Sequence, residues 1–108
     1  MANLLRGEIE ADIGGARRTL CLTLGALAEL EAAFGAGDVI ALAERFQRGG
    51  LSARDLVAII ACGLRGAGAM VSDADVAAMR VDGGLNGYVR IAADLIAATF
   101  GGPAETPR

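Results

Sequence analysis

Residues 5–24 carry a hydrophobic pattern with a period of two, which predicts two β-strands. Charged side chains occupy every second position between apolar or small residues over 5–13, and leucines recur at every second position toward the end of 17–24. This alternation is typical of strands with one buried face. Gly14-Gly15 lies between the two runs, and glycine tolerates the positive φ angles of a two-residue turn. The pattern therefore predicts a β-hairpin over about residues 5–24.

The position of the turn also predicts which residues of the hairpin face one another. A two-residue turn defines one register, and the hydrophobic pattern selects the same register. The expected pairs are Ile9 with Leu20, Leu5 with Leu24, and Asp12 with Arg17. One face should pack on helices, because a hairpin alone is only marginally stable. We expect Leu20, Leu22 and Leu24 to be buried, and Glu8, Glu10 and Asp12 to be exposed.

After the hairpin the hydrophobic period becomes that of an α-helix, and cap and turn residues divide the chain into short helices. Gly35 is expected to end the first of them. Asp38, Ser52 and Ser72 stand at N-cap positions, and the two serines are each followed three residues later by an aspartate, as in a capping box. The predicted fold class is α+β, mainly α: an N-terminal β-hairpin followed by four to five short packed helices.

The last predicted helix, about residues 85–100, is apolar over an unusually wide arc. At 100° per residue its apolar positions span roughly 220°, against the roughly 100° stripe of an ordinary surface helix. Either the other helices surround it, or part of its surface meets a partner. We expect Tyr88 and Leu95 to face the core. Val89, Ile96 and Phe100 are the candidate partner-binding residues, shared with another protein or a second copy.

The chain length suits one domain. We expect this domain to cover residues 1–102, with the hairpin at about 5–24 and the helices at about 25–100. A Gly-Gly-Pro sequence ends the last helix, and residues 103–108 are expected to form a flexible C-terminal tail.

The composition excludes several kinds of chemistry. The chain has no histidine, and all 10 basic residues are arginine, which excludes a histidine triad, a histidine metal site, a phosphate-loop lysine and a Schiff-base lysine. The formal charge of −3 is unlike the clustered basic footprint of nucleic-acid-binding proteins. We therefore expect no catalytic, cofactor-binding or metal-binding residues, no nucleic-acid partner and no enzymatic activity.

Hydropathy and cysteine usage predict a cytoplasmic protein. The longest uncharged runs, residues 19–28 and 95–104, are too short for a membrane-spanning helix of about 20 residues. Charged residues interrupt the N-terminus before any apolar signal region develops. Two cysteines are too few for a disulfide framework, so Cys21 and Cys62 are interpreted as small core residues.

Three other features have a functional and a simpler structural interpretation. The Gly63–Gly68 stretch lacks the spacing and the lysine of a nucleotide-binding loop, so we expect a flexible linker between helices. Asp73 and Asp75 fit acids in a first helical turn better than a metal site. The residues expected to form an ordinary solvated surface are Glu29, Glu31, Arg45, Arg48, Arg54 and Arg65. Contact of the arginines with an acidic partner is the alternative.

Three segments carry a resemblance to a family of phage origin. They are residues 22–31 (LTLGALAELE), 42–46 (LAERF) and 51–56 (LSARDL). Over about residues 3–100 the chain resembles the gene transfer agent family of phage tail assembly chaperones, also labelled phage tail tube proteins. The resemblance implies a non-enzymatic protein of a gene transfer agent or prophage-like particle. It also implies binding to tape measure and tail tube proteins during tail assembly, and no cofactor.

Two alternatives to the chaperone stay open. The first is a structural component of the tail. Tail tubes are built from β-sandwich rings with long strands, whereas strand patterns here are confined to the short hairpin, which favours the chaperone. The second is a small regulatory protein-interaction domain, although the chain lacks a basic recognition helix. Whether the protein forms a homo-oligomer is open in all three cases.

Overall fold

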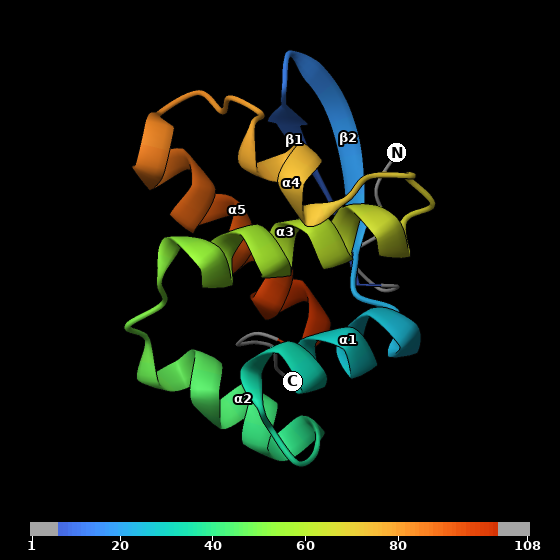
Figure 1. Cartoon of the computed structure of the whole chain (residues 1–108), viewed down its shortest axis with the longest axis vertical. Helices are drawn as coiled ribbons and strands as arrows, with labels where there is room; N and C mark the ends of the chain where they lie inside the picture. The colour runs from blue at the N-terminus through green and yellow to red at the C-terminus, as the bar shows by residue number, and fades with distance from the viewer. Residues whose placement is uncertain (1–6, 102–108) are drawn as a thin grey trace, which may run out of the picture.

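A computed structural model describes residues 7–101 of the chain. The described part contains one antiparallel β-hairpin followed by five helices, as predicted (Figure 1). The elements are β1 (Glu8–Ile13), β2 (Ala16–Cys21), α1 (Leu24–Phe34), α2 (Val39–Arg48), α3 (Ala53–Gly66), α4 (Asp73–Ala77) and α5 (Gly84–Thr99). The proposed domain bounds and the tail at 103–108 extend outside the described residues, and they stay predictions.

The register of the hairpin is confirmed. Ile9 pairs with Leu20, and Asp12 pairs with Arg17 across the Gly14-Gly15 turn, where both glycines have positive φ. Leu20 and Leu22 are buried, as expected. On the other face Asp12 is exposed, whereas Glu8 and Glu10 are half-buried rather than fully exposed. The predicted Leu5–Leu24 pair involves a residue outside the described part of the chain.

The prediction that Leu24 is a buried strand residue is wrong. Strand β2 ends at Cys21, and Leu24 is the first residue of α1 with 82% of its surface exposed. The physical reason is the cap formed by Thr23, whose hydroxyl accepts a hydrogen bond from the Ala26 amide at 3.1 Å. This side-chain bond satisfies an otherwise unpaired amide at the helix start. The alternation of leucines therefore continues past the end of the strand.

The three predicted N-caps and the predicted end of the first helix are confirmed. Asp38, Ser52 and Ser72 all act as N-caps, and both serines form complete capping boxes with the aspartate three residues later. Asp75 thus serves as a cap partner, as expected for an acid in a first helical turn. Gly35 ends α1 in the left-handed conformation, which glycine adopts without steric cost.

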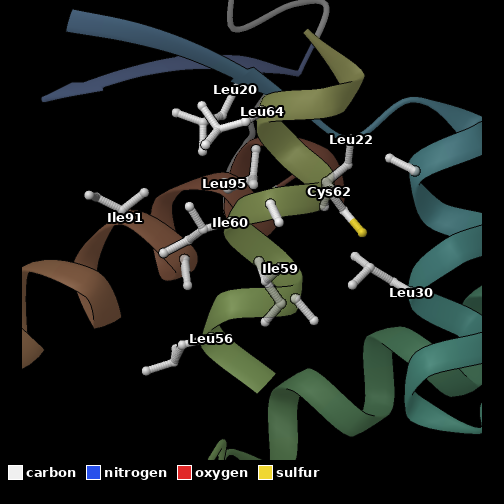
Figure 2. Close-up of a cluster of buried hydrophobic side chains, with 14 of the residues drawn as sticks. Leu20, Leu22, Leu30, Leu56, Ile59, Ile60, Cys62, Leu64, Ile91 and Leu95 are labelled. Atoms are coloured by element: carbon white, nitrogen blue, oxygen red, sulfur yellow. The ribbon is translucent and has the colours of Figure 1, made fainter. Parts of the chain in front are cut away.

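Helix α3 lies at the centre of the fold (Figure 1). It packs against β2, α1, α4 and α5. Every residue of α3 from Ala58 to Leu64 is buried. Figure 2 shows Ile59, Ile60 and Leu64 of this helix among leucines of β2, α1 and α5. Cys62 is buried in the same cluster, whereas Cys21 is only half-buried. The core is therefore built around one helix.

The expectation of a flexible linker at Gly63–Gly68 is wrong for its first half. Helix α3 continues through Gly66, and two of its glycines lie where neighbouring elements approach closely. A Cβ at Gly63 would lie 2.5 Å from a methyl group of Leu95, and a Cβ at Gly66 would collide with the backbone carbonyl of Cys21. These glycines let α5 and β2 approach the helix surface.

Arg65 joins three helices through ion pairs. Its guanidinium lies 2.8 Å from Glu29 of α1 and 3.0 Å from Asp73 of α4, and it also donates to the Val71 carbonyl at 3.1 Å. Arg45 similarly lies 3.4 Å from Asp55 and donates to the Gly49 carbonyl at 2.8 Å. The prediction of an ordinary solvated surface is therefore wrong for these two arginines, which are half-buried and connect elements of the fold. Glu29 is exposed, as expected, and also takes part in the ion pair with Arg65.

The ion pair with Arg65 predicts that Glu29 contributes to stability only above acidic pH. Arg65, and secondly the Cys62 thiol, hold the pKa of Glu29 below its usual value. A lowered folded-state pKa stabilises the native state above the unfolded pKa, and this contribution disappears as pH falls through the folded pKa. In urea titrations, Glu29→Gln should be less stable than wild type at pH 7, and the difference should shrink as the pH is lowered toward 3, because the carboxylate becomes protonated as the pH falls through its lowered folded-state pKa.

The matched control is Glu31→Gln on the same helix. Among residues 7–101, Glu31 takes part in no ion pair. This variant should remain close to wild type at both pH values. A stability difference for Glu29→Gln that stays constant from pH 7 to pH 3 would contradict the role assigned to the ion pair.

Candidate protein-contact groove

An apolar groove runs between α2 and α5 and forms the candidate site. One part of it, of about 390 Å³, is lined by Phe46, Gly49, Gly50, Leu51, Leu56, Val89, Ala92, Ala93, Ile96 and Ala97. The adjoining part, of about 370 Å³, is lined by Ala43, Phe46, Gln47, Ile96, Ala97, Phe100 and Gly101. Because the two parts share Phe46, Ile96 and Ala97, we treat them as one surface, the α2/α5 groove.

Aromatic contacts hold the two walls of the groove in place. Phe46 of α2 meets Phe34 of α1 edge-on, with ring centroids 5.3 Å apart, and meets Phe100 at 6.2 Å. Both distances lie in the range of favourable aromatic pairs. The Arg45 guanidinium lies 5.7 Å from the Phe34 ring centroid, within cation–π distance. The wall formed by α2 is therefore anchored at Phe46.

Small residues account for the hollow between the walls. Ala92, Ala93 and Ala97 occupy the side of α5 that lines the groove, and Gly49-Gly50 line it beyond the end of α2. These residues supply little or no side-chain volume, so the larger side chains around them enclose an open surface. None of the residues lining the groove carries a charge. The groove is thus suited to apolar contact rather than to chemistry.

The structure brings the three predicted partner-binding residues into this groove. Val89 and Ile96 line its first part, and Ile96 and Phe100 line its second. Val89 is 47% exposed, whereas Ile96 and Phe100 are half-buried against the core. Leu95 is fully buried, as expected, and Tyr88 is half-buried with its hydroxyl donating to the Met79 carbonyl. The wide apolar arc of α5 is therefore divided between the core and an open surface.

The wall contributed by α2 was not predicted from the sequence. Phe46 lies in the core, and its second role beside α5 depends on contacts between segments far apart in the chain. Gln47 and Ala43 carry no sequence signal for a site. Ile40 and Leu85, which are 71% and 66% exposed, extend the exposed apolar surface of α2 and α5. The sequence signal that could have indicated this wall is the excess of apolar residues on α2 beyond those in the core.

Other parts of the described surface are weaker candidates for a functional site. A hollow of about 410 Å³ between β1 and α5 is lined by charges of both signs, among them Asp12, Arg17 and Arg90. Within residues 7–101, no three or more histidine, cysteine, aspartate or glutamate side chains gather as metal ligands would. Burial raises the pKa of the Cys62 thiol to about 12, so this thiol is protonated at neutral pH and is a poor nucleophile.

The described part of the chain has no helix with the length and apolar character needed to span a bilayer.

A protein-family model described as phage tail tube protein, GTA-gp10, matches residues 6–102. No curated protein and no solved structure matches the chain. The matched region includes every helix and strand described above, so the groove lies within it.

Proposed function

The chain belongs to the phage tail tube protein, GTA-gp10 family, and from this membership we propose that it acts in a gene transfer agent-type tail by binding other tail proteins through the α2/α5 groove. The apolar lining of the groove is the observation that supports this proposal. Exposed apolar surface beyond what a monomer needs is typical of protein-contact sites. Val89, Ile96 and Phe100 would contribute apolar contacts, and no catalytic step is involved.

The family description supports a structural tail component more directly than an assembly chaperone. A specific observation nevertheless favours the chaperone as a second candidate. The described residues form a single two-stranded sheet with strands of six residues, which is unlike a tube wall of long strands. In this role the protein would hold tape measure or tail tube proteins in the cytoplasm during assembly and leave before the particle is complete.

Immunoblotting of purified particles separates the two candidates. A structural component should be present in mature particles in a fixed ratio to the other tail proteins. A chaperone should be abundant in assembling cells and absent from mature particles. Either outcome leaves the groove as the proposed contact site, because both roles require binding to tail proteins.

Two neighbouring substitutions on α5 test the groove itself. Ile96→Ser should retain the fold and should lose co-purification with tail tube and tape measure proteins, because Ile96 is half-buried and lines the groove. Leu95→Ser should lower the free energy of unfolding by about 3 kcal/mol or more, because it places a hydroxyl and a cavity in the core. Far-ultraviolet circular dichroism and urea titration measure folding in both variants.

Equal loss of folding in both variants would place this whole side of α5 in the core. Normal partner binding by a folded Ile96→Ser variant would exclude the groove as the contact site. In either case the arginines of the middle helices that make no ion pair among residues 7–101, Arg48 and Arg54, would become the next surface to test.

A further inference from the structure

The segment that connects α3 to α5 is attached to the rest of the protein at few points. Residues 67–83 comprise the loop after α3, helix α4 and the turn before α5. Val76 of α4 is fully buried, and every other residue of this segment is exposed or half-buried. Helix α4 lies beside α3 and packs mainly on it (Figure 1). We call residues 67–83 the α4 strap.

Polar contacts hold the start of the strap. Arg65 of α3 donates to the Val71 carbonyl at 3.1 Å and lies 3.0 Å from Asp73. The side chain of Asp73 is more than half exposed, and an ion pair of this kind contributes little because water competes for both charges.

Two hydrogen bonds hold the end of the strap. The Tyr88 hydroxyl of α5 donates to the Met79 carbonyl. The Gly14 amide, in the turn of the hairpin, donates to the Arg80 carbonyl at 2.8 Å. The strap is therefore fastened by polar groups at both ends and by one fully buried side chain between them.

The hydrogen bonds that shape α4 lie within the strap. Ser72 and Asp75 form the capping box of the helix, and the Val76 and Met79 amides donate to the carbonyls of Ser72 and Val76. None of these bonds involves α3 or α5. The strap can therefore separate from α3 without losing them.

The strap also forms one side of an apolar hollow of about 280 Å³. The lining residues are Ala53, Leu56, Val57, Val76, Ala77, Gly84, Leu85 and Tyr88, from α3, the strap and the start of α5. Leu56 lines both this hollow and the α2/α5 groove. The apolar surface therefore continues from the groove to the place where Val76 is buried.

We propose that the α4 strap opens from α3 as a unit while the rest of the fold stays intact. Opening takes Val76 out of the core and releases the polar contacts at the two ends. A segment with few buried apolar contacts separates at a lower free energy than the whole domain unfolds. The open form exposes the sides of α3 and α5 that face the strap, and so lengthens the apolar surface that begins in the groove. This inference goes beyond the proposed function, because it does not depend on which protein the groove binds.

Native-state hydrogen exchange of the full chain, followed by nuclear magnetic resonance, tests the opening. The amides of Val76, Met79 and Gly14 all donate to carbonyls of the strap. They should share one opening free energy and exchange about 100-fold or more faster than the buried run of α3, after correction for intrinsic rates. Low concentrations of urea should speed their exchange, with a smaller slope than for α3, because the slope is proportional to the surface exposed.

Two substitutions separate opening of the strap from global unfolding. Val76→Ala should speed exchange of the strap amides by about 10-fold, because it weakens the buried contact of the strap. The matched control is Leu30→Ala in α1, a helix that packs on α2 and α3. The contacts of Leu30 persist when the strap opens, so this variant should speed exchange of the α3 amides by about 30-fold or more and leave the strap amides unchanged.

Three results would overturn the opening. In wild type, equal protection and equal urea slopes for the strap and α3 would mean that the strap separates only when the whole domain unfolds. Exchange of the strap amides that does not respond to urea would mean that single hydrogen bonds break without exposing the surface beneath. Equal acceleration of strap and α3 amides in Leu30→Ala would also contradict the proposal. None of these measurements involves a tail protein, so their failure leaves the groove to be judged by Ile96→Ser.

Discussion

Replacing Gly66 with alanine is expected to lower the free energy of unfolding by at least about 2 kcal/mol. The new Cβ would collide with the carbonyl of Cys21, which is backbone and cannot move away as a flexible side chain can. Strand β2 and the end of α3 would have to separate, and the core between them would lose contacts. Urea titration followed by circular dichroism measures the effect, with the denaturation midpoint as the readout.

Gly25→Ala in α1 is the matched control. Gly25 is also helical, but the nearest atom to its new Cβ would be the Thr23 hydroxyl at 3.9 Å, an ordinary contact distance. Alanine has the higher helix propensity, by up to about 1 kcal/mol. This variant should therefore be as stable as wild type or more stable. Similar gains in both variants would show that β2 does not approach α3 at Gly66.

The parts of the fold that the sequence predicted well depend on local interactions. The hairpin register follows from a glycine turn and a hydrophobic alternation within a single segment. The starts of α2, α3 and α4 follow from Asp38, Ser52 and Ser72, whose side chains bond to amides only three residues away. Such contacts form between neighbours in the chain, so the sequence alone contains the information needed to predict them.

The features that were missed depend on segments distant in sequence. Arg65 and Glu29 are 36 residues apart, and their ion pair requires α1 and α3 to be packed already. Gly63 and Gly66 resembled a helix breaker because glycine is common in linkers, whereas their role depends on Leu95 and Cys21. A single sequence does not distinguish a glycine that ends a helix from one that admits a neighbouring element.

For the same reason, the sequence indicated only one of the two walls of the α2/α5 groove. The excess of apolar residues on α5 indicated one wall of the groove, because that excess is a property of one helix. The other wall depends on Phe46, which brings α2 against α5 through Phe100. The sequence thus predicted the character of the site better than its extent.

The second large effect is expected at the leucines that the alternation could not distinguish. Leu20→Ala should lower the free energy of unfolding by about 3 kcal/mol, because Leu20 is fully buried and packs beside Gly63 of α3. Leu24→Ala should change it by less than about 0.5 kcal/mol, because Leu24 is 82% exposed at the start of α1. Urea titration of both variants measures the contrast. Equal losses would mean that β2 extends through Leu24 and that the Thr23 cap does not form, so this pair of substitutions locates the point where the chain changes from strand to helix.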